Sequence, residues 1–173
     1  MKKLLFVKCN FKDSVSPFED LIDKKIRTLP RQLPQLIYSI SALSPYIKQL
    51  IQTELDWLAN IVDENIDVVL SKIIIECSEN IQIDTISKVR IAKRRTNLII
   101  LLADFGKVFE LSEVTTALSV FADSILELLM DLYTFNEFQR VNYSTLFVDT
   151  KNYPSSIVGA ASKAGLLALG MGK

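Results

Sequence analysis

The residues best suited to chemistry close the sequence, which ends Gly170-Met171-Gly172-Lys173. They follow an apolar run, Leu166 to Leu169, which is typical of a buried strand. A glycine turn after a strand lets backbone N–H groups approach a phosphate. The spacing matches neither a Walker A loop nor a dinucleotide-binding fingerprint. Taken alone, the turn makes Gly170, Gly172 and Lys173 candidate phosphate-binding residues and no more.

A second candidate is a group of five basic residues: Lys88, Arg90, Lys93, Arg94 and Arg95. Such a group could contact phosphates or RNA, and RNA binding would weaken steeply with salt. No aromatic residue interleaves with the group, and the chain carries 20 basic and 20 acidic residues. Because the net charge is zero, we favour a solvated helix face whose charges pair with acidic neighbours.

Carboxylates one helical turn apart, such as Asp123 and Glu127, can hold a metal or exchange protons. The group Asp63, Glu64 and Asp67 offers the same residue types. Pairs of this kind are common on solvated helix faces, and we favour that interpretation for both groups.

Some residue types are missing, and their absence excludes several kinds of site. The chain has no histidine, so it holds no Ser-His-Asp or Cys-His system and no histidine-ligated zinc. Cys9 and Cys77 are far apart and form no CxxC pair, which favours free thiols in a reducing compartment. We therefore expect no complete active site, no catalytic residue and no metal ligand in these residues.

The chain also shows no signal for export or for a membrane. The opening MKKLLF is too short for a secretory core, and no apolar stretch reaches the length of about 18 residues that a membrane span needs. We expect a cytoplasmic protein that binds neither nucleic acid nor membrane.

These candidates must be positioned by helices, because half of the residues are apolar and Gly and Pro are rare. Ser16 and Glu19 suggest a capping box, and Ser44-Pro45 and Ser112 mark further helix starts. The predicted helices cover residues 17–29, 35–41, 45–62, 65–77, 84–109, 112–132 and 155–164, and the predicted strands cover residues 145–149 and 165–171. The helix from Ser112 carries a near-continuous apolar stripe: Val114, Ala117, Leu118, Phe121, Ala122, Ile125, Leu128, Leu129 and Leu132.

The final apolar strand indicates how the chain is organised. A buried strand needs partner strands, so we expect the chain to be the front part of a larger protein. The alternative is a flexible tail of small residues. The predicted fold is mainly α, with a helical region over residues 1–133. Residues 134–173 would then begin an incomplete α/β domain.

Two stretches of the sequence, taken together, strengthen the weak functional signal of the glycine turn. Residues 97–131 read NLIILLADFGKVFELSEVTTALSVFADSILELLMD, and the chain ends LALGMGK. Together with the helix start Leu43-Ser44-Pro45-Tyr46, they resemble the bifunctional glutamine synthetase adenylyltransferase/adenylyl-removing enzyme of the alphaproteobacterial type. The resemblance covers most of residues 40–173 in the same order along the chain, and the first forty residues add little to it.

The resemblance implies a nucleotidyltransferase core that begins at the final strand and turn. In that family the Gly-Lys turn cradles phosphate, and a Ser-Asp-x-Asp motif about ten residues later holds magnesium. This chain ends at Lys173, before any such motif. The matching half of the family enzyme removes AMP from a tyrosine of glutamine synthetase by phosphorolysis. The other half adds AMP from ATP, and the PII signal protein sets the balance.

Two functional hypotheses follow. The chain is either an N-terminal fragment of this regulator of nitrogen metabolism, inactive alone because it lacks the metal-binding aspartates, or a stand-alone helical module. The module would bind glutamine synthetase or a PII-like protein. The parent family implies Mg²⁺ and a nucleotide as cofactors, and the fragment alone is expected to use neither.

Overall fold

The computed structural model describes residues 2–4, 18–30, 32–78, 84–141 and 159–166. Helices make up about four fifths of this described part, which contains no strand. The helices are α1 (Asp20–Arg27), α2 (Leu33–Leu43), α3 (Pro45–Ile61), α4 (Ile66–Ser78), α5 (Thr85–Phe105), α6 (Leu111–Val141) and α7 (Ala160–Lys163). The prediction of a mainly α protein is therefore confirmed.

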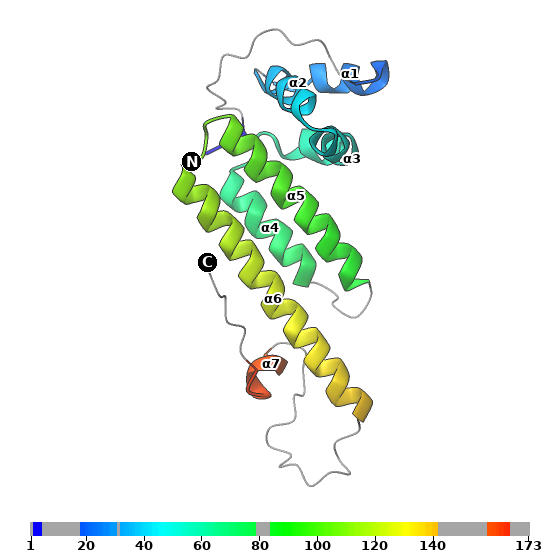
Figure 1. The fold of residues 1–173 in the computed structure, drawn as a ribbon, viewed down its shortest axis with the longest axis vertical. Coiled ribbons are helices and arrows are strands. Elements are labelled where there is room, and N and C mark those ends of the chain that lie inside the picture. The colour runs from blue at the N-terminus through cyan, green and yellow to red at the C-terminus, as the bar shows by residue number, and fades with distance from the viewer. Residues whose placement is uncertain (1, 5–17, 31, 79–83, 142–158, 167–173) are drawn as a thin grey trace.

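Three long helices, α4, α5 and α6, run side by side and form the body of the molecule (Figure 1). Helices α1, α2 and α3 pack together at one end of this body, and α7 packs on α6 toward the other end. The first residues of the chain are tied to the same body, because Ile66 donates its backbone N–H to the Lys2 carbonyl at 2.9 Å. Leu4 is buried in the core.

Helix α5 is the central element, since it contacts α2, α3, α4 and α6. Its second half is apolar, and Leu98, Ile99 and Leu102 are completely buried there. Each such side chain contributes roughly 1.5–3 kcal/mol by leaving water. A helix can be buried on several sides only where all of its faces carry apolar residues. The first half of α5 is charged and therefore lies at the surface.

Helix α5 ends at Phe105, four residues before the predicted end at Phe109. Gly106 closes the helix, and Lys107 takes a left-handed conformation at φ 54°. The backbone N–H groups of Val108 and Phe109 both donate to the Ala103 carbonyl, at 2.8 and 3.1 Å. These bonds satisfy a carbonyl that the helix leaves unpaired and turn the chain toward α6.

Helix α6 begins one residue earlier than predicted and is held by a cap that differs from the predicted Ser112. The Glu113 carboxylate accepts the backbone N–H of Glu110 at 2.8 Å, which is one half of a capping box. The same carboxylate forms an ion pair with Lys2. The bond from Lys2, and then the bond from Glu110, lower the pKa of Glu113 below its ordinary value of 4.5.

The apolar stripe of α6 is wider than the face of the helix that packs against the rest of the molecule. Ile125 and Leu132 are buried, and five other stripe residues lie partly buried against the core. Leu118 is 43% exposed and Ala122 is exposed. The helix also continues to Val141, past the predicted end at Leu132 and through the predicted domain boundary at residues 133–134.

The other helix boundaries agree with the sequence to within a few residues, apart from two starts. Helix α1 begins at Asp20 with Glu19 at its N-cap, so Glu19 does not occupy the third helical position of a capping box. Ser16, the other half of that predicted box, lies outside the described residues. The small-residue helix is described from Ala160, after Gly159 in a left-handed conformation at φ 73°, and its predicted start at Ser155 lies outside the described residues.

Neither predicted strand is observed in the described residues. Residues 145–149 and 167–171 lie outside them. Of the second strand, Gly165 is in a turn at φ 75°, and the Leu166 N–H donates to the Ala161 carbonyl within the same turn. A helix that ends in a left-handed glycine closes on itself there, so a strand cannot start at Gly165. In the described residues, no helix is long and apolar enough to span a bilayer.

Candidate functional site

The predicted phosphate-binding residues Gly170, Gly172 and Lys173 lie outside the described residues. The part of the chain that leads to them is described up to Leu166. The element that precedes the turn is α7, and its attachment to α6 is the geometry that the structure provides (Figure 1).

A single carboxylate fastens α7 to α6. Asp131 is 7% exposed, and its Oδ2 accepts the Gly159 N–H at 2.7 Å while its Oδ1 accepts the Ala161 N–H at 2.9 Å. Both donors belong to the start of α7, where backbone N–H groups have no partner within the helix. Ala160 and Ala161 are buried, so the two backbones approach closely. We call this arrangement the Asp131 latch.

The Asp131 latch was not predicted from the sequence. The available signal was a lone acidic residue that follows Leu128 and Leu129 and precedes Leu132, on the apolar side of the helix. An acid in that position needs a hydrogen-bonding partner when it is buried. Sequence alone does not reveal that the partner is a helix start about thirty residues later.

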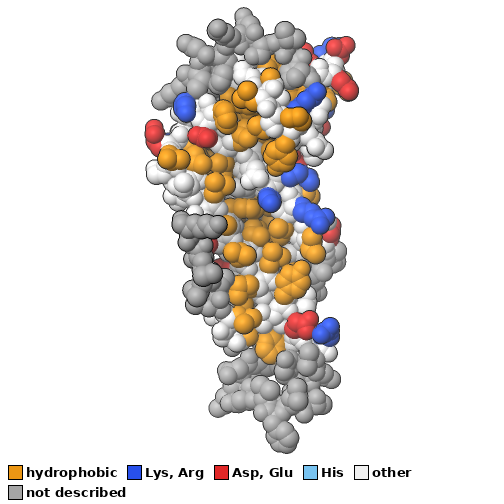
Figure 2. Space-filling model, in the orientation of Figure 1, with side chains coloured by type: hydrophobic (Ala, Val, Ile, Leu, Met, Phe, Trp, Pro, Cys, Tyr) orange, Lys and Arg blue, Asp and Glu red, His pale blue; other side chains and the backbone are white. Residues whose placement is uncertain are grey.

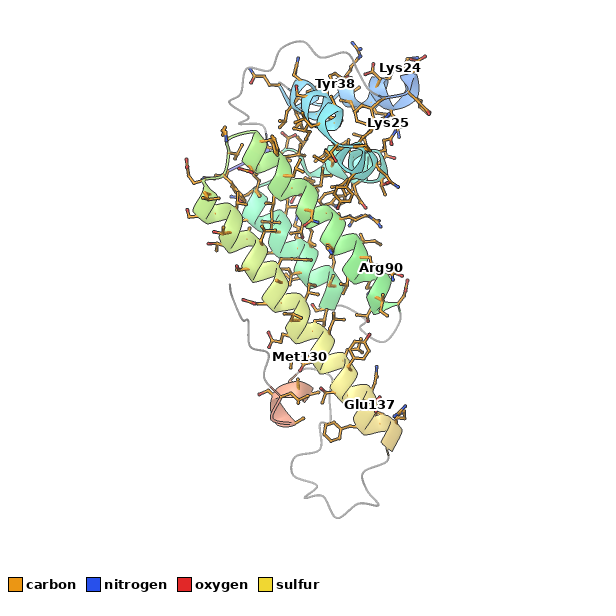
Figure 3. All side chains as sticks on the ribbon, viewed as in Figure 1. Lys24, Lys25, Tyr38, Arg90, Met130 and Glu137 are labelled. Atoms are coloured by element: carbon orange, nitrogen blue, oxygen red, sulfur yellow. The ribbon has the colours of Figure 1, made fainter. Side chains whose placement is uncertain are left out.

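Beside the latch, a hollow of about 380 Å³ separates the last turns of α6 from the end of α7. Its wall includes Tyr133, Glu137 and Phe138 from α6, and Ala164 and Leu166 from the chain after α7. Figure 3 labels Met130 and Glu137 on this length of α6, with Met130 beside α7. The latch and this hollow lie in the last part of the chain that the structure describes.

The basic cluster divides into two parts. Arg94 and Arg95 both bind the Glu54 carboxylate of α3, at 2.8 and 3.1 Å, and Glu54 is only 4% exposed. The Arg95 guanidinium also lies 4.8 Å from the centre of the Trp57 ring, close enough for a cation–π interaction. The expected pairing with acidic neighbours is thus confirmed for these two arginines, which join α5 to α3.

Arg90 and Lys93 are exposed on α5, and Arg90 is labelled near the start of that helix in Figure 3. Figure 2 shows basic side chains along one flank of the visible face, beside hydrophobic side chains that gather down its middle.

The carboxylate pairs stay on the surface, as predicted. Asp123 and Glu127 are exposed on α6, Asp63 is exposed, and Glu64 pairs with Lys72 at 2.6 Å. Within the described ranges, no three His, Cys, Asp or Glu side chains come close enough to hold a metal ion.

Of the two cysteines, Cys77 is a free and buried thiol, and burial raises its pKa. Cys9 lies outside the described residues.

Comparison with known proteins identifies the chain at the level of its family. The family model of glutamate-ammonia ligase adenylyltransferase matches residues 34–173, from the start of α2 to Lys173. Neither the curated proteins nor the solved structures contain a significant match. Since the family model covers most of the sequence, including the latched helix α7, the chain belongs to the glutamate-ammonia ligase adenylyltransferase family.

Proposed function

We propose that the chain is the N-terminal part of an enzyme that adenylylates or deadenylylates glutamine synthetase. In this proposal the helices form a scaffold, and Gly170, Gly172 and Lys173 form the turn that cradles the nucleotide phosphates. The family match over residues 34–173 carries the proposal. The Asp131 latch supports the scaffold role, because it fixes α7 to α6 a few residues before Gly170 in the sequence.

We infer that these residues do not hold the metal ion of the reaction. Nucleotidyl transfer in the family uses Mg²⁺, which stabilises the charge on the transferring phosphate. The described residues offer no ligand set for the ion, and the sequence contains no Ser-Asp-x-Asp motif. We therefore expect these 173 residues to have no nucleotidyltransferase activity by themselves.

An activity assay tests this expectation. The chain is incubated with adenylylated glutamine synthetase, phosphate and Mg²⁺, and the ADP formed by phosphorolysis of the tyrosyl–AMP bond is measured. We expect no ADP above the level of a reaction without the chain. Release of ADP in proportion to the amount of chain would show that the scaffold proposal is wrong.

A second candidate function is a stand-alone module that binds glutamine synthetase or a PII-like protein. One observation favours it: Leu111, Leu118, Leu126 and Tyr133 on α6 are each at least 43% exposed. Their spacing of seven or eight residues places them on one side of the helix. Exposed apolar rows of this kind often mark protein interfaces.

Pull-downs with glutamine synthetase and with a PII-like protein examine this second candidate. Binding that is lost on Leu118→Glu and kept on Ser119→Glu would support the module. Ser119 is the adjacent exposed residue of α6 and lies outside the apolar row, so it serves as the matched control.

A further inference from the structure

Helix α6 carries a mostly apolar row of side chains on the side that faces away from α4. Its members recur every three or four residues: Leu111, Thr115, Leu118, Ala122, Leu126, Leu129 and Tyr133. All of them are exposed except Leu129, which is partly buried. On the opposite side of the helix, Thr116, Ala117 and Val120 line the pocket between α6 and α4. We call the row the α6 seam, because this spacing lets two parallel helices pack knobs into holes.

The edge of the α6 seam next to α5 is basic. Lys88, Ile91 and Arg95 line a hollow between α5 and α4. Arg90 and Lys93 are exposed on the opposite side of α5, so they border the same face of the bundle as the seam. Neither of them forms an ion pair within the described part of the chain, in contrast to Arg95. In Figure 2, basic side chains follow one flank of the hydrophobic side chains.

The edge of the α6 seam remote from α5 is acidic. Asp123 and Glu127 directly follow the seam residues Ala122 and Leu126, so each lies about 100° further round the helix. The buried Ile125 directly precedes Leu126 and marks the opposite direction, toward the core. Asp123 and Glu127 are exposed, and no described residue forms an ion pair with either of them. The seam therefore lies between two edges of opposite charge.

The two charged edges lie at the same level along the bundle. Lys93 is twelve residues before the end of α5, and Asp123 is twelve residues after the start of α6. At 1.5 Å per residue, each lies about 18 Å from the turn that joins the two helices. A two-fold axis along the seam therefore brings the basic edge of one copy onto the acidic edge of the other. A two-fold axis across the seam would instead bring edges of like charge together.

We propose that the α6 seam binds a second copy of this chain, with the two α6 helices parallel and related by a two-fold axis along the seam. The seam side chains of the two copies interdigitate, and the basic edge of each copy pairs with the acidic edge of the other. This self-complementary arrangement of charge favours a second copy over the partner proteins considered above. The inference concerns self-association and is independent of the proposed role in adenylyl transfer.

Sedimentation equilibrium at low ionic strength, where surface charges are least screened, measures the mass of the chain in solution. We expect the mass to rise with concentration from 19.5 kDa to twice that value. Leu126→Glu places a charge in the seam and should leave only the monomer. Val120→Glu is the matched control, because both residues are 50% exposed but Val120 faces α4. This control variant should dimerise like the unmodified chain.

Charge reversal tests the arrangement of the two copies. Lys93→Glu and Asp123→Lys each place like charges at both symmetric contacts, so each should weaken the dimer about tenfold. An equimolar mixture of the two variants should dimerise about as tightly as the unmodified chain, since every contact again joins opposite charges. Lys24→Glu makes the same change of net charge on α1, away from the seam, and should have no effect.

Three results would overturn the proposal. The first is a chain that stays monomeric at every concentration, whether or not the pull-downs find a partner protein for the seam. The second is a dimer that survives Leu126→Glu in a variant that melts cooperatively. The third is a mixture of Lys93→Glu and Asp123→Lys that dimerises no more tightly than either variant alone.

Discussion

Glu54 shows how one carboxylate can hold two helices together. It lies almost completely buried on α3 and accepts bonds from Arg94 and Arg95 of α5. The two arginines keep part of their side-chain surface in water. Each guanidinium therefore loses less hydration free energy than the Glu54 carboxylate does. The network joins α3 to α5 through a carboxylate that has little access to water.

Glu54→Ala should lower the free energy of unfolding by about 1–3 kcal/mol, because two arginines lose their shared partner. The measurement is urea unfolding followed by circular dichroism. Asp56→Ala is the control on the same helix: its pair with Lys25 is exposed, and its loss should cost under about 0.5 kcal/mol. Equal costs for the two variants would contradict the role given to Glu54.

Glu113 should make stability depend on acid. Its pKa in the folded state is lowered, first by the bond from Lys2 and then by the bond from Glu110. Because the pKa is lowered, the charged carboxylate stabilises the fold at pH values above its ordinary pKa of 4.5. This stabilisation disappears as the pH falls through the pKa of the folded state. Glu113→Gln should therefore be less stable than the unmodified chain near neutral pH, and the difference should shrink below about pH 4.

Lys2→Met tests the assigned cause of this dependence, with urea midpoints measured across the same pH range. Because the bond from Lys2 contributes most to the lowered pKa of Glu113, Lys2→Met should remove most of the pH dependence of stability that Glu113 causes. If the stability difference between the unmodified chain and Lys2→Met were the same at every pH, the Lys2–Glu113 ion pair would play no part in the acid dependence.

At the scale of elements, the end of α5 contains a residue in an unfavourable conformation. Lys107 adopts a positive φ of 54°, at a position where helices usually carry glycine. Lys107→Gly should raise the free energy of unfolding by up to about 1 kcal/mol, by relieving this cost. Lys107→Ala retains the strain and is the control. A thermal melt in which the glycine variant is less stable than the alanine variant would refute the argument.

The Asp131 latch makes a prediction about a single short element. Asp131→Ala removes both acceptors of the α7 amides, so hydrogen exchange at Ala160 to Ser162 should accelerate at least about tenfold. Amides in the middle of α5 should change little, because their protection depends on the core. Asp123→Ala alters an exposed acid of the same helix and should leave α7 unchanged. Unchanged exchange in α7 with Asp131→Ala would contradict the latch.

The elements differ in how well the sequence predicted them, and the reasons are physical. Helix α3 begins at Pro45 as predicted, because Ser44-Pro45 is a local signal. The predicted end of α5 is four residues too late, because the apolar pattern continues past Gly106, whereas Lys107 turns the chain in a left-handed conformation there. The Asp131 latch depends on contacts between residues about thirty positions apart, which periodicity within one helix does not encode.

The family resemblance was carried by a different kind of signal. The run around LADFGKVFELSEVTTALSVFAD and the terminal LALGMGK indicated the family, and the family model confirms it over residues 34–173. The predicted role of Gly170, Gly172 and Lys173 stays a prediction, since they lie outside the described residues.

At the scale of the whole molecule, the described part is a helical body with α7 fixed to one side of its longest helix (Figure 1). Helix α6 joins the two regions, since its first turns pack in the bundle and its last turns support α7. We propose that this body is a scaffold, and that adenylyl transfer requires metal-binding aspartates that these residues do not supply.

The most direct test joins this chain at Lys173 to the Ser-Asp-x-Asp core of an enzyme of the same family. ADP release from adenylylated glutamine synthetase is then measured with phosphate and Mg²⁺. We predict release from the joined protein, much slower release when it carries Asp131→Ala, and none from the chain alone. Equal rates with and without Asp131→Ala, or no gain when the core is joined to this chain, would contradict the scaffold account.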